Sequence, residues 1–201
     1  MEEALGESYR IFEDNLSKTE TVVLTGGNFG EKFAEKLSRN KFSLTNTKFI
    51  LSDERLSCAD NKKNSFLIFK KFKKMGFYER NFFYDFYDEK LVDQYGGLFD
   101  FDNTSLDICF LSIGDDGHIA GHFSNSINIT SFLSKTNNSP KPPKNRISLR
   151  LDYLSKARII IVLAIGSEKK KALEDFIEDK NKESRILRNH KKLFLISDCL
   201  V

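Results

Sequence analysis

The sequence contains no tryptophan, two methionines, three prolines and three cysteines in 201 residues. Cys58, Cys109 and Cys199 form no CxxC pair, and their odd number predicts structural, reduced thiols instead of a disulfide framework. An apolar run long enough to cross a bilayer is also missing, since the longest covers only residues 159–165. The first ten residues, MEEALGESYR, are acidic where a signal peptide is basic. Together these absences predict a cytoplasmic protein.

A strong excess of one charge is lacking as well. The 32 basic and 29 acidic residues leave a net charge of +3, and lysine-rich stretches are interleaved with acidic residues over most of the chain. A nucleic-acid-binding protein concentrates its positive charge in a stripe, and a membrane-surface helix sets a basic face against an apolar one. The sequence therefore predicts neither a nucleic-acid nor a membrane partner. It leaves open whether the protein is a monomer or a homodimer.

Short apolar, β-branched or aromatic runs alternate with amphipathic segments along the chain. The predicted strands cover residues 21–24, 48–51, 81–86, 107–113, 146–149, 158–165 and 192–196. The predicted helices cover residues 3–16, 31–39, 62–74, 89–99 and 168–178, and Ser167 is the expected cap of the last one. This alternation predicts a single α/β domain over residues 1–201, a three-layer α/β/α sandwich with a mainly parallel, Rossmann-like sheet.

All three prolines lie in the polar stretch 124–145, the longest candidate loop. A loop of that length inside a compact domain is often a lid, a binding loop or a disordered segment. We expect this one to be poorly ordered without a ligand. Whether it closes over a substrate stays open.

Glycines and charged side chains gather directly after the predicted strands. In open α/β sheets, ligands bind beyond the carboxyl ends of the strands, where loops meet helix N-termini. Parallel strands would therefore bring these charged groups to one edge of the sheet. The groups are Asp53, Glu54, Arg55, Asp115, Asp116, His118 and Lys169.

The segment TGGNFGEKF follows the first predicted strand. It lacks the Walker lysine pattern and the GxGxxG spacing, so it does not indicate a nucleotide site. Two interpretations remain: a strand-to-helix turn capped by Asn28 and Glu31, or a phosphate site built on Gly26 and Gly27. Lys169 has the same ambiguity, because EKKK is typical of a solvated helix face. A cation in the first turn of a helix, however, is disfavoured unless an anion lies nearby.

The segment IGDDGHIAGHF follows the fourth predicted strand and places His118 in a glycine-bounded turn. A histidine side chain titrates near neutral pH and can take a proton from water. A capping turn with an incidental histidine is one alternative, and a metal site shared by His118 and His122 is another. The zincin pattern requires Glu directly after the first histidine, where Ile119 stands. The pattern therefore favours a metal-independent general base.

The order LTGG, SDER, LDICFLSIGDDGHIA, RISL and IGSEKKKAL resembles the 6-phosphogluconolactonases, which share a superfamily with the glucosamine-6-phosphate deaminases. The resemblance runs from about Val22 to the C-terminus, and GxDGH and DER are its most specific parts. It implies a three-layer α/β/α fold. It also implies hydrolysis of 6-phospho-D-glucono-1,5-lactone to 6-phosphogluconate, the second step of the pentose phosphate pathway, with no cofactor and no metal.

Carried over by position, the resemblance implies roles for six residues. His118 would be the general base, and Arg55 and Lys169 would bind the phosphate together with the backbone N–H groups of Gly26 and Gly27. Arg146 would line the same pocket. The chemistry adds further expectations: backbone N–H groups near residues 114–117, or Arg55, stabilise the oxyanion. Asp116 fixes the turn or orients the imidazole, and Asp53 contacts a sugar hydroxyl.

Two other functions remain open. The deaminases carry DEY where this chain has DER, and FNEP where it has Gly121, His122, Phe123 and Ser124. A non-catalytic sugar-phosphate-binding protein is the other alternative, because the serine, threonine and proline that usually follow the glycine pair are missing. Release of ammonia from glucosamine 6-phosphate would identify the first, and binding without lactone hydrolysis the second.

Overall fold

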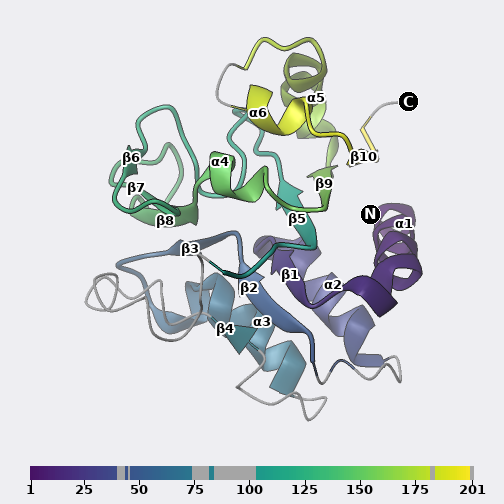
Figure 1. Ribbon diagram of the computed structural model, residues 1–201. Helices are drawn as coiled ribbons and strands as arrows, with labels where there is room; N and C mark the ends of the chain where they lie inside the picture. The colour runs from purple at the N-terminus through teal and green to yellow at the C-terminus, as the bar shows by residue number, and fades with distance from the viewer. Residues whose placement is uncertain (40–43, 45, 74–81, 84–102, 182–183, 200–201) are drawn as a thin grey trace.

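The computed structural model describes residues 1–39, 44, 46–73, 82–83, 103–181 and 184–199. Its centre is a parallel six-stranded sheet in the order β10-β9-β5-β1-β2-β4 (Figure 1). The mainly parallel sheet that the sequence predicts is thus confirmed. The strands are β1 Thr21–Leu24, β2 Lys48–Leu51, β4 Phe82–Phe83, β5 Ile108–Ser112, β9 Ile159–Ala164 and β10 Leu193–Ser197.

The central strands are apolar along their whole length because both faces of the sheet are covered. Every residue of β1 and of β9 is buried, which is typical of parallel strands between two helix layers. An aromatic group anchors one layer to the sheet: the ring of Phe33 lies 4.5 Å from that of Phe110 and 6.0 Å from that of Phe12, centroid to centroid. The resulting core positions the strand ends that carry the candidate residues.

The helices form two groups, with α1, α2 and α3 together in the lower part of Figure 1 and α4, α5 and α6 together at the top. Helix α2 buries Phe29, Phe33 and Leu37, which recur every four residues and so share one face. The predicted cap by Ser167 is wrong: a 3-10 turn over Ser167–Lys169 precedes α5, and neither has a side-chain cap. The helices are α1 Glu2–Asn15, α2 Gly27–Arg39, α3 Asn64–Lys73, α4 Leu151–Leu154, α5 Lys170–Ile177 and α6 Arg185–Arg188.

A second, antiparallel sheet in the order β3-β8-β7-β6 corrects two expectations. The predicted strand 146–149 exists, as β8, but it belongs to this sheet and not to the parallel one. The stretch 124–145 is not an irregular loop, because it contains β6 and β7 and the latter pairs with β8. Pairing satisfies its backbone N–H and C=O groups, which allows a polar segment to be ordered. The remaining strands of this sheet are β3 Asp53–Arg55, β6 Ile127–Asn128, β7 Leu133–Thr136 and β8 Arg146–Leu149.

A single residue, Ser52, joins the two sheets between the end of β2 and the start of β3. Its N–H donates to the Leu24 carbonyl in the parallel sheet at 2.8 Å. Its carbonyl accepts from the Leu149 N–H at 2.9 Å and from the Ser148 hydroxyl at 3.1 Å, both in the second sheet. The direction of β3, and with it the position of Arg55, therefore follows from hydrogen bonds in both sheets.

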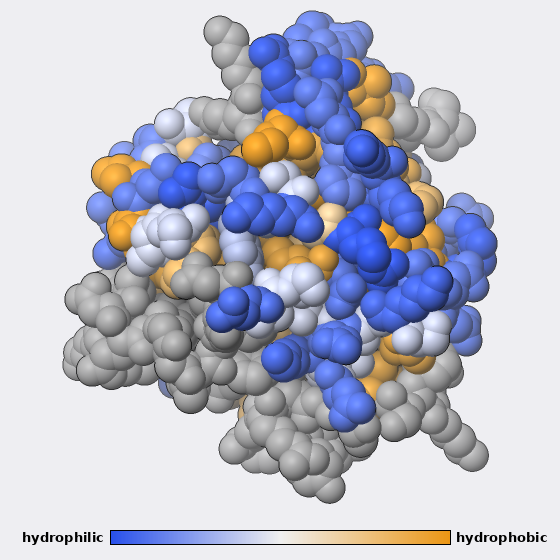
Figure 2. Space-filling view, in the orientation of Figure 1, coloured by the Kyte–Doolittle hydropathy of each residue, from blue (hydrophilic) through white to orange (hydrophobic). Residues whose placement is uncertain are grey.

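Some predictions concern residues outside the described part. The predicted helix 89–99 lies there entirely, and only Phe82–Phe83 of the predicted strand 81–86 is described. No helix within the described ranges has the length and apolar content needed to span a bilayer. On the face shown in Figure 2, hydrophilic residues predominate and hydrophobic ones form small, separate patches.

Candidate active site

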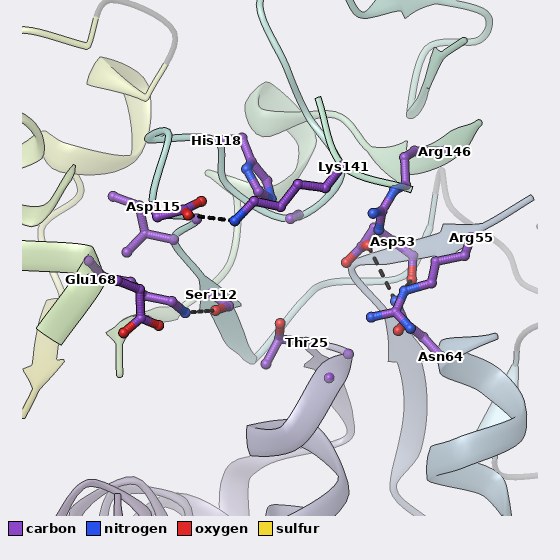
Figure 3. A pocket seen from close by; sticks show the side chains of 16 residues that line it. Thr25, Asp53, Arg55, Asn64, Ser112, Asp115, His118, Lys141, Arg146 and Glu168 are labelled. Atoms are coloured by element: carbon purple, nitrogen blue, oxygen red, sulfur yellow. Dashed lines mark hydrogen bonds and ion pairs between the residues drawn. The ribbon is translucent and has the colours of Figure 1, made fainter. Parts of the chain in front are cut away.

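The candidate residues meet at a cavity of about 220 Å³ beyond the carboxyl ends of β1, β2, β5 and β9 (Figure 3). Strands β1 and β5 are neighbours although the chain passes through β2 and β4 between them, so the cavity lies where the strand order reverses. Open α/β sheets bind their ligands at such a point. Sixteen residues line it: Thr25, Gly26, Gly27, Asp53, Arg55, Asn64, Ser112, Ile113, Gly114, Asp115, His118, Ala120, Lys141, Arg146, Glu168 and Lys169.

Gly26 and Gly27 form the start of α2 at the floor of the cavity. A Cβ atom on Gly26 would lie 2.2 Å from Cγ of Asn64, at the start of α3, so a side chain is excluded there by close approach. Because α2 is thirteen residues long and begins at Gly27, its first N–H groups and its positive dipole end face the cavity. Asn28 is inside the helix and is not its cap. The floor of the cavity is thus suited to an anion.

Glu54 has a structural task that the sequence does not reveal. Its Oε1 accepts from the N–H groups of Arg55 at 2.6 Å and Asn64 at 2.7 Å, and its Oε2 accepts from the N–H of Ser65 at 2.8 Å. The carboxylate therefore fixes the start of α3 to β3. Burial raises the pKa of Glu54, and the three N–H donors oppose that shift.

Asp53 lies beside the anion floor and is buried. Its Oδ1 accepts from the Ser52 hydroxyl at 2.8 Å, and its Oδ2 accepts from Nδ2 of Asn64 at 3.3 Å. Two oxygens that are already oriented by neighbours can still accept a hydrogen bond from a ligand hydroxyl.

Arg55 and Arg146 are register partners in the β3–β8 pair. Directly opposed residues of an antiparallel pair project from the same face, and like charges in that arrangement destabilise the sheet. Burial lowers the pKa of the Arg146 guanidinium; the Arg55 charge lowers it further, while Asp53 raises it. Their hydrogen bonds offset little of this repulsion, since Nη1 of Arg55 donates to the Lys62 carbonyl and Nε of Arg146 to that of Pro143.

One donor of Arg55 has no partner. Its Nε is buried and forms no hydrogen bond within the part of the chain that the structure describes. A buried, unsatisfied donor on a charged group is costly, and an anion in the cavity would satisfy it while neutralising the opposed pair. The two arginines are therefore candidate ligands of an anion in the cavity.

Lys169 supplies a further positive charge to the cavity from the end of β9. Its Nζ donates to the Ser112 hydroxyl at 3.1 Å. Burial lowers the pKa of Lys169, and the Glu168 carboxylate opposes this shift. The interpretation of EKKK as a solvated helix face does not hold for this lysine, which turns inward while Lys170 and Lys171 are exposed.

The His118 imidazole is held within its own turn. Nδ1 contacts Oδ1 of Asp116, which also accepts from the His118 N–H at 3.3 Å. The ring stacks on Phe123 with centroids 4.2 Å apart and lies over Gly114, where a Cβ would come within 2.2 Å of the ring. Asp116 stands behind the imidazole, on a neighbouring cavity of about 390 Å³. With Nδ1 engaged, Nε2 is the nitrogen that can accept a proton.

Two backbone N–H groups of this turn are occupied. The Gly114 N–H donates to the His118 carbonyl at 2.8 Å, and the Gly117 N–H to the Gly114 carbonyl at 3.1 Å. These two groups are therefore engaged within the turn, and stabilisation of an oxyanion by this turn or by Arg55 stays a prediction.

The sequence did not predict where the side chains of His122 and Lys141 lie. Nδ1 of His122 lies 3.3 Å from the Ser134 hydroxyl of β7, so His122 contacts the second sheet. Across the described ranges, no group of three or more His, Cys, Asp or Glu side chains could hold a metal ion; the metal-independent reaction stays a prediction. Lys141 lines the cavity beside His118 and forms an ion pair with Asp115. Its position among the three prolines was the only feature of the sequence that could have drawn attention to it.

Residues 10–193 match the model of a family described as glucosamine-6-phosphate isomerases/6-phosphogluconolactonase. The chain is similar to the 6-phosphogluconolactonase of Borreliella burgdorferi, with 26% identity over 94% of this chain and 89% of that protein. It is similar to the 6-phosphogluconolactonase of Thermotoga maritima, with 27% identity over 96% and 86% of the two chains. A crystal structure of 6-phosphogluconolactonase from Thermotoga maritima shares the fold, with a TM-score of 0.81 at 23% identity over 98% of this chain and 94% of that one.

Proposed function

The chain belongs to the family of glucosamine-6-phosphate isomerases and 6-phosphogluconolactonases, and we propose that within it the chain hydrolyses 6-phospho-D-glucono-1,5-lactone to 6-phosphogluconate. The observation that carries this proposal is the pair of opposed arginines, Arg55 and Arg146, in the cavity that also holds His118. An anion site and a general base within one small cavity suit a neutral, hydrolysable ring that carries a phosphate. The three cysteines are free thiols, which is consistent with the reducing cytoplasm in which we propose that this reaction takes place.

The phosphate of the substrate lies at the floor of the cavity. Arg55 and Arg146 donate to its oxygens from the second sheet, and Lys169 adds a point charge from the opposite side. The first N–H groups of α2, at Gly26 and Gly27, complete the site. Asp53 accepts a hydrogen bond from a sugar hydroxyl. This arrangement leaves the lactone ring above the floor, toward His118 (Figure 3).

His118 acts on water. Nε2 takes a proton as the water oxygen forms a bond to C1, and the carbonyl π electrons move to the carbonyl oxygen. The tetrahedral intermediate then collapses: the bond from C1 to the ring oxygen breaks, and the imidazolium returns its proton to that oxygen. The carboxylic acid formed loses a proton to solvent. Asp116 keeps Nδ1 protonated and stabilises the imidazolium.

Lactone hydrolysis is favoured over deamination by the residues around the base. Deamination opens a ring and moves protons between carbons, and the sequences of the deaminases carry a carboxylate shortly after the histidine turn. Here Gly121 and His122 follow, and His122 contacts the second sheet. In addition, the third residue of DER is Arg55, which lines the cavity and in this proposal binds the phosphate.

The test is a direct assay of both reactions. Purified protein is expected to accelerate opening of 6-phosphogluconolactone above its spontaneous rate, which is measured in parallel and subtracted. It is expected to release no ammonia from glucosamine 6-phosphate. Ammonia release without lactone hydrolysis would establish the deaminase instead. Tight binding of 6-phosphogluconate with no acceleration would establish a non-catalytic binding protein.

A further inference from the structure

Lys141 lines the cavity between His118 and Arg146, and its ammonium end points toward Asp115, on the His118 side (Figure 3). Its Nζ donates to Oδ2 of Asp115 at 2.5 Å across 26 residues of sequence. Its backbone is anchored by the fully buried Ser139, whose hydroxyl donates to the carbonyls of Lys141 at 2.7 Å and Pro143 at 3.0 Å. The ordered segment thus holds a cation beside the turn that carries His118.

The two ends of the substrate differ in when they carry a negative charge that a cation can stabilise. The phosphate is charged throughout, and three cations already surround its floor. The carbonyl oxygen at C1 is neutral in the lactone and becomes negative only when water adds beside His118. In the turn that carries His118, the N–H groups of Gly114 and Gly117 are already engaged by backbone carbonyls. The positive side chain on the His118 side of the cavity is therefore matched to that developing charge.

We infer that Lys141 is a further catalytic residue, whose ammonium leaves Asp115 and stabilises the oxyanion that forms at C1. This inference rests on the proposed function. No bond to Lys141 forms or breaks, because the ammonium keeps its three protons and contributes a charge-assisted hydrogen bond. The product carboxylate at C1 is held by the same ammonium until release.

Asp115 serves to keep Lys141 charged and in place between turnovers. Its hydrogen bond raises the pKa of Lys141, and the pKa of Asp115 is lowered in return, chiefly by Lys141. The side chain of Lys141 is 62% exposed, and exposed ion pairs contribute little to stability. Exchange of the Asp115 carboxylate for a substrate oxyanion is therefore energetically easy.

The experiment compares K141M with K144M on two substrates, 6-phosphogluconolactone and unphosphorylated gluconolactone. Lys144 is the matched control, because it belongs to the same segment, contacts the Pro140 carbonyl at 3.4 Å and does not line the cavity. K141M is expected to lower kcat about 10- to 150-fold on both lactones, as loss of one charge-assisted hydrogen bond predicts. K144M is expected to retain the kcat of the unmodified protein, and K141R to recover part of the loss.

Other outcomes overturn the inference in distinguishable ways. A rise in KM confined to the phosphorylated lactone would make Lys141 a phosphate ligand. Equal kcat for K141M and K144M would remove it from catalysis, and equal loss in D115N and K141M would make the ion pair merely structural; we expect D115N to lose less. Thermal unfolding of each variant checks its fold. If H118A abolishes hydrolysis while K141M does not, the proposed function stands and only this inference fails.

Discussion

The two sides of the cavity are built in different ways. On the anion side, Arg55 and Arg146 project from paired strands 91 positions apart in sequence, and Glu54 fixes the start of α3 beside them. On the base side, His118 is held by Asp116, two residues away, and by Phe123. In the proposed mechanism, substrate binding therefore depends on long-range folding, whereas the base depends on one short turn. Substitutions on the two sides should have separable effects.

Replacement of His118 by Ala should have the largest effect of all the variants, and it should affect the base side alone. Loss of a positioned general base lowers kcat by roughly 10²- to 10⁴-fold, and the intact anion side should keep KM much the same. Steady-state kinetics after subtraction of spontaneous hydrolysis measures both constants. H122N is the contrasting variant, because His122 contacts β7 and should matter far less. Near-normal kcat in H118A would exclude the mechanism.

Changes on the anion side should have the opposite signature. R55A and K169A each remove a charge-assisted hydrogen bond to phosphate, so KM for the phosphorylated lactone should rise by about 10- to 150-fold with a smaller change in kcat. Unphosphorylated gluconolactone should be a poor substrate that is indifferent to both changes. Lys170 is exposed and next in sequence, which makes K170A a suitable control. Equal damage to both lactones by K169A would remove Lys169 from the phosphate site.

Substitution of Glu54 tests the hydrogen bonds that hold the start of α3 to β3 on the anion side, and it leaves the His118 turn unchanged. In E54Q an amide NH₂ replaces a carboxylate oxygen, so at least one buried N–H loses its acceptor and stability should fall by about 1–3 kcal/mol. Chemical denaturation measures this, with E3Q on the exposed part of α1 as the control. Because α3 starts beside the anion floor, KM should rise more than kcat falls. Unchanged stability would refute the anchoring role.

The same residue gives a pH dependence with a defined sign. Burial raises the pKa of Glu54 in the folded chain, so its contribution to stability is fully present below the unfolded pKa of about 4.3. That contribution declines as pH rises through the folded pKa. E54Q has no group to titrate there, so the stability difference between the two proteins should change over this range. A constant difference across it would show that burial does not perturb Glu54.

The smallest expected effect is that of metal removal. Neither side of the cavity needs a metal in the proposed mechanism, since the phosphate is held by cationic side chains and the water by His118. Exhaustive chelation should therefore leave kcat and KM unchanged. Loss of activity that zinc or manganese restores would contradict this and would make the base side dependent on a bound ion.

The sequence predicted the parallel sheet well because its strands are buried on both faces and read as apolar runs. The bounds predicted for β1 and β2 match, and those for β5, β9 and β10 differ by one residue at each end. The resemblance to the family is confirmed by the match over residues 10–193. The residues proposed from it all line the cavity or, for Asp116, contact the imidazole; their roles remain predictions.

The second sheet was missed, apart from the strand β8, because β3 and β7 are polar and β6 has only two residues. β3 reads DER, and β7 buries Ser134 and Thr136, whose hydroxyls form hydrogen bonds that are not visible in a hydrophobic pattern. The stretch 124–145 was consequently interpreted as one long loop, although it contains β6 and β7. Lys141 could not be placed for the same reason, since its position depends on the pairing of β7 with β8.

The hydrogen bonds of Ser52 restrict how the two sheets, and thus the two sides of the cavity, can move relative to each other. Many two-part proteins open by rotation about a flexible linker, but here one residue separates the sheets and both of its backbone groups are bonded, one to each sheet. Rotation of the second sheet about Ser52 would break these bonds. The amide hydrogen of Leu149 should accordingly exchange with solvent only through global unfolding, as slowly as those of β1.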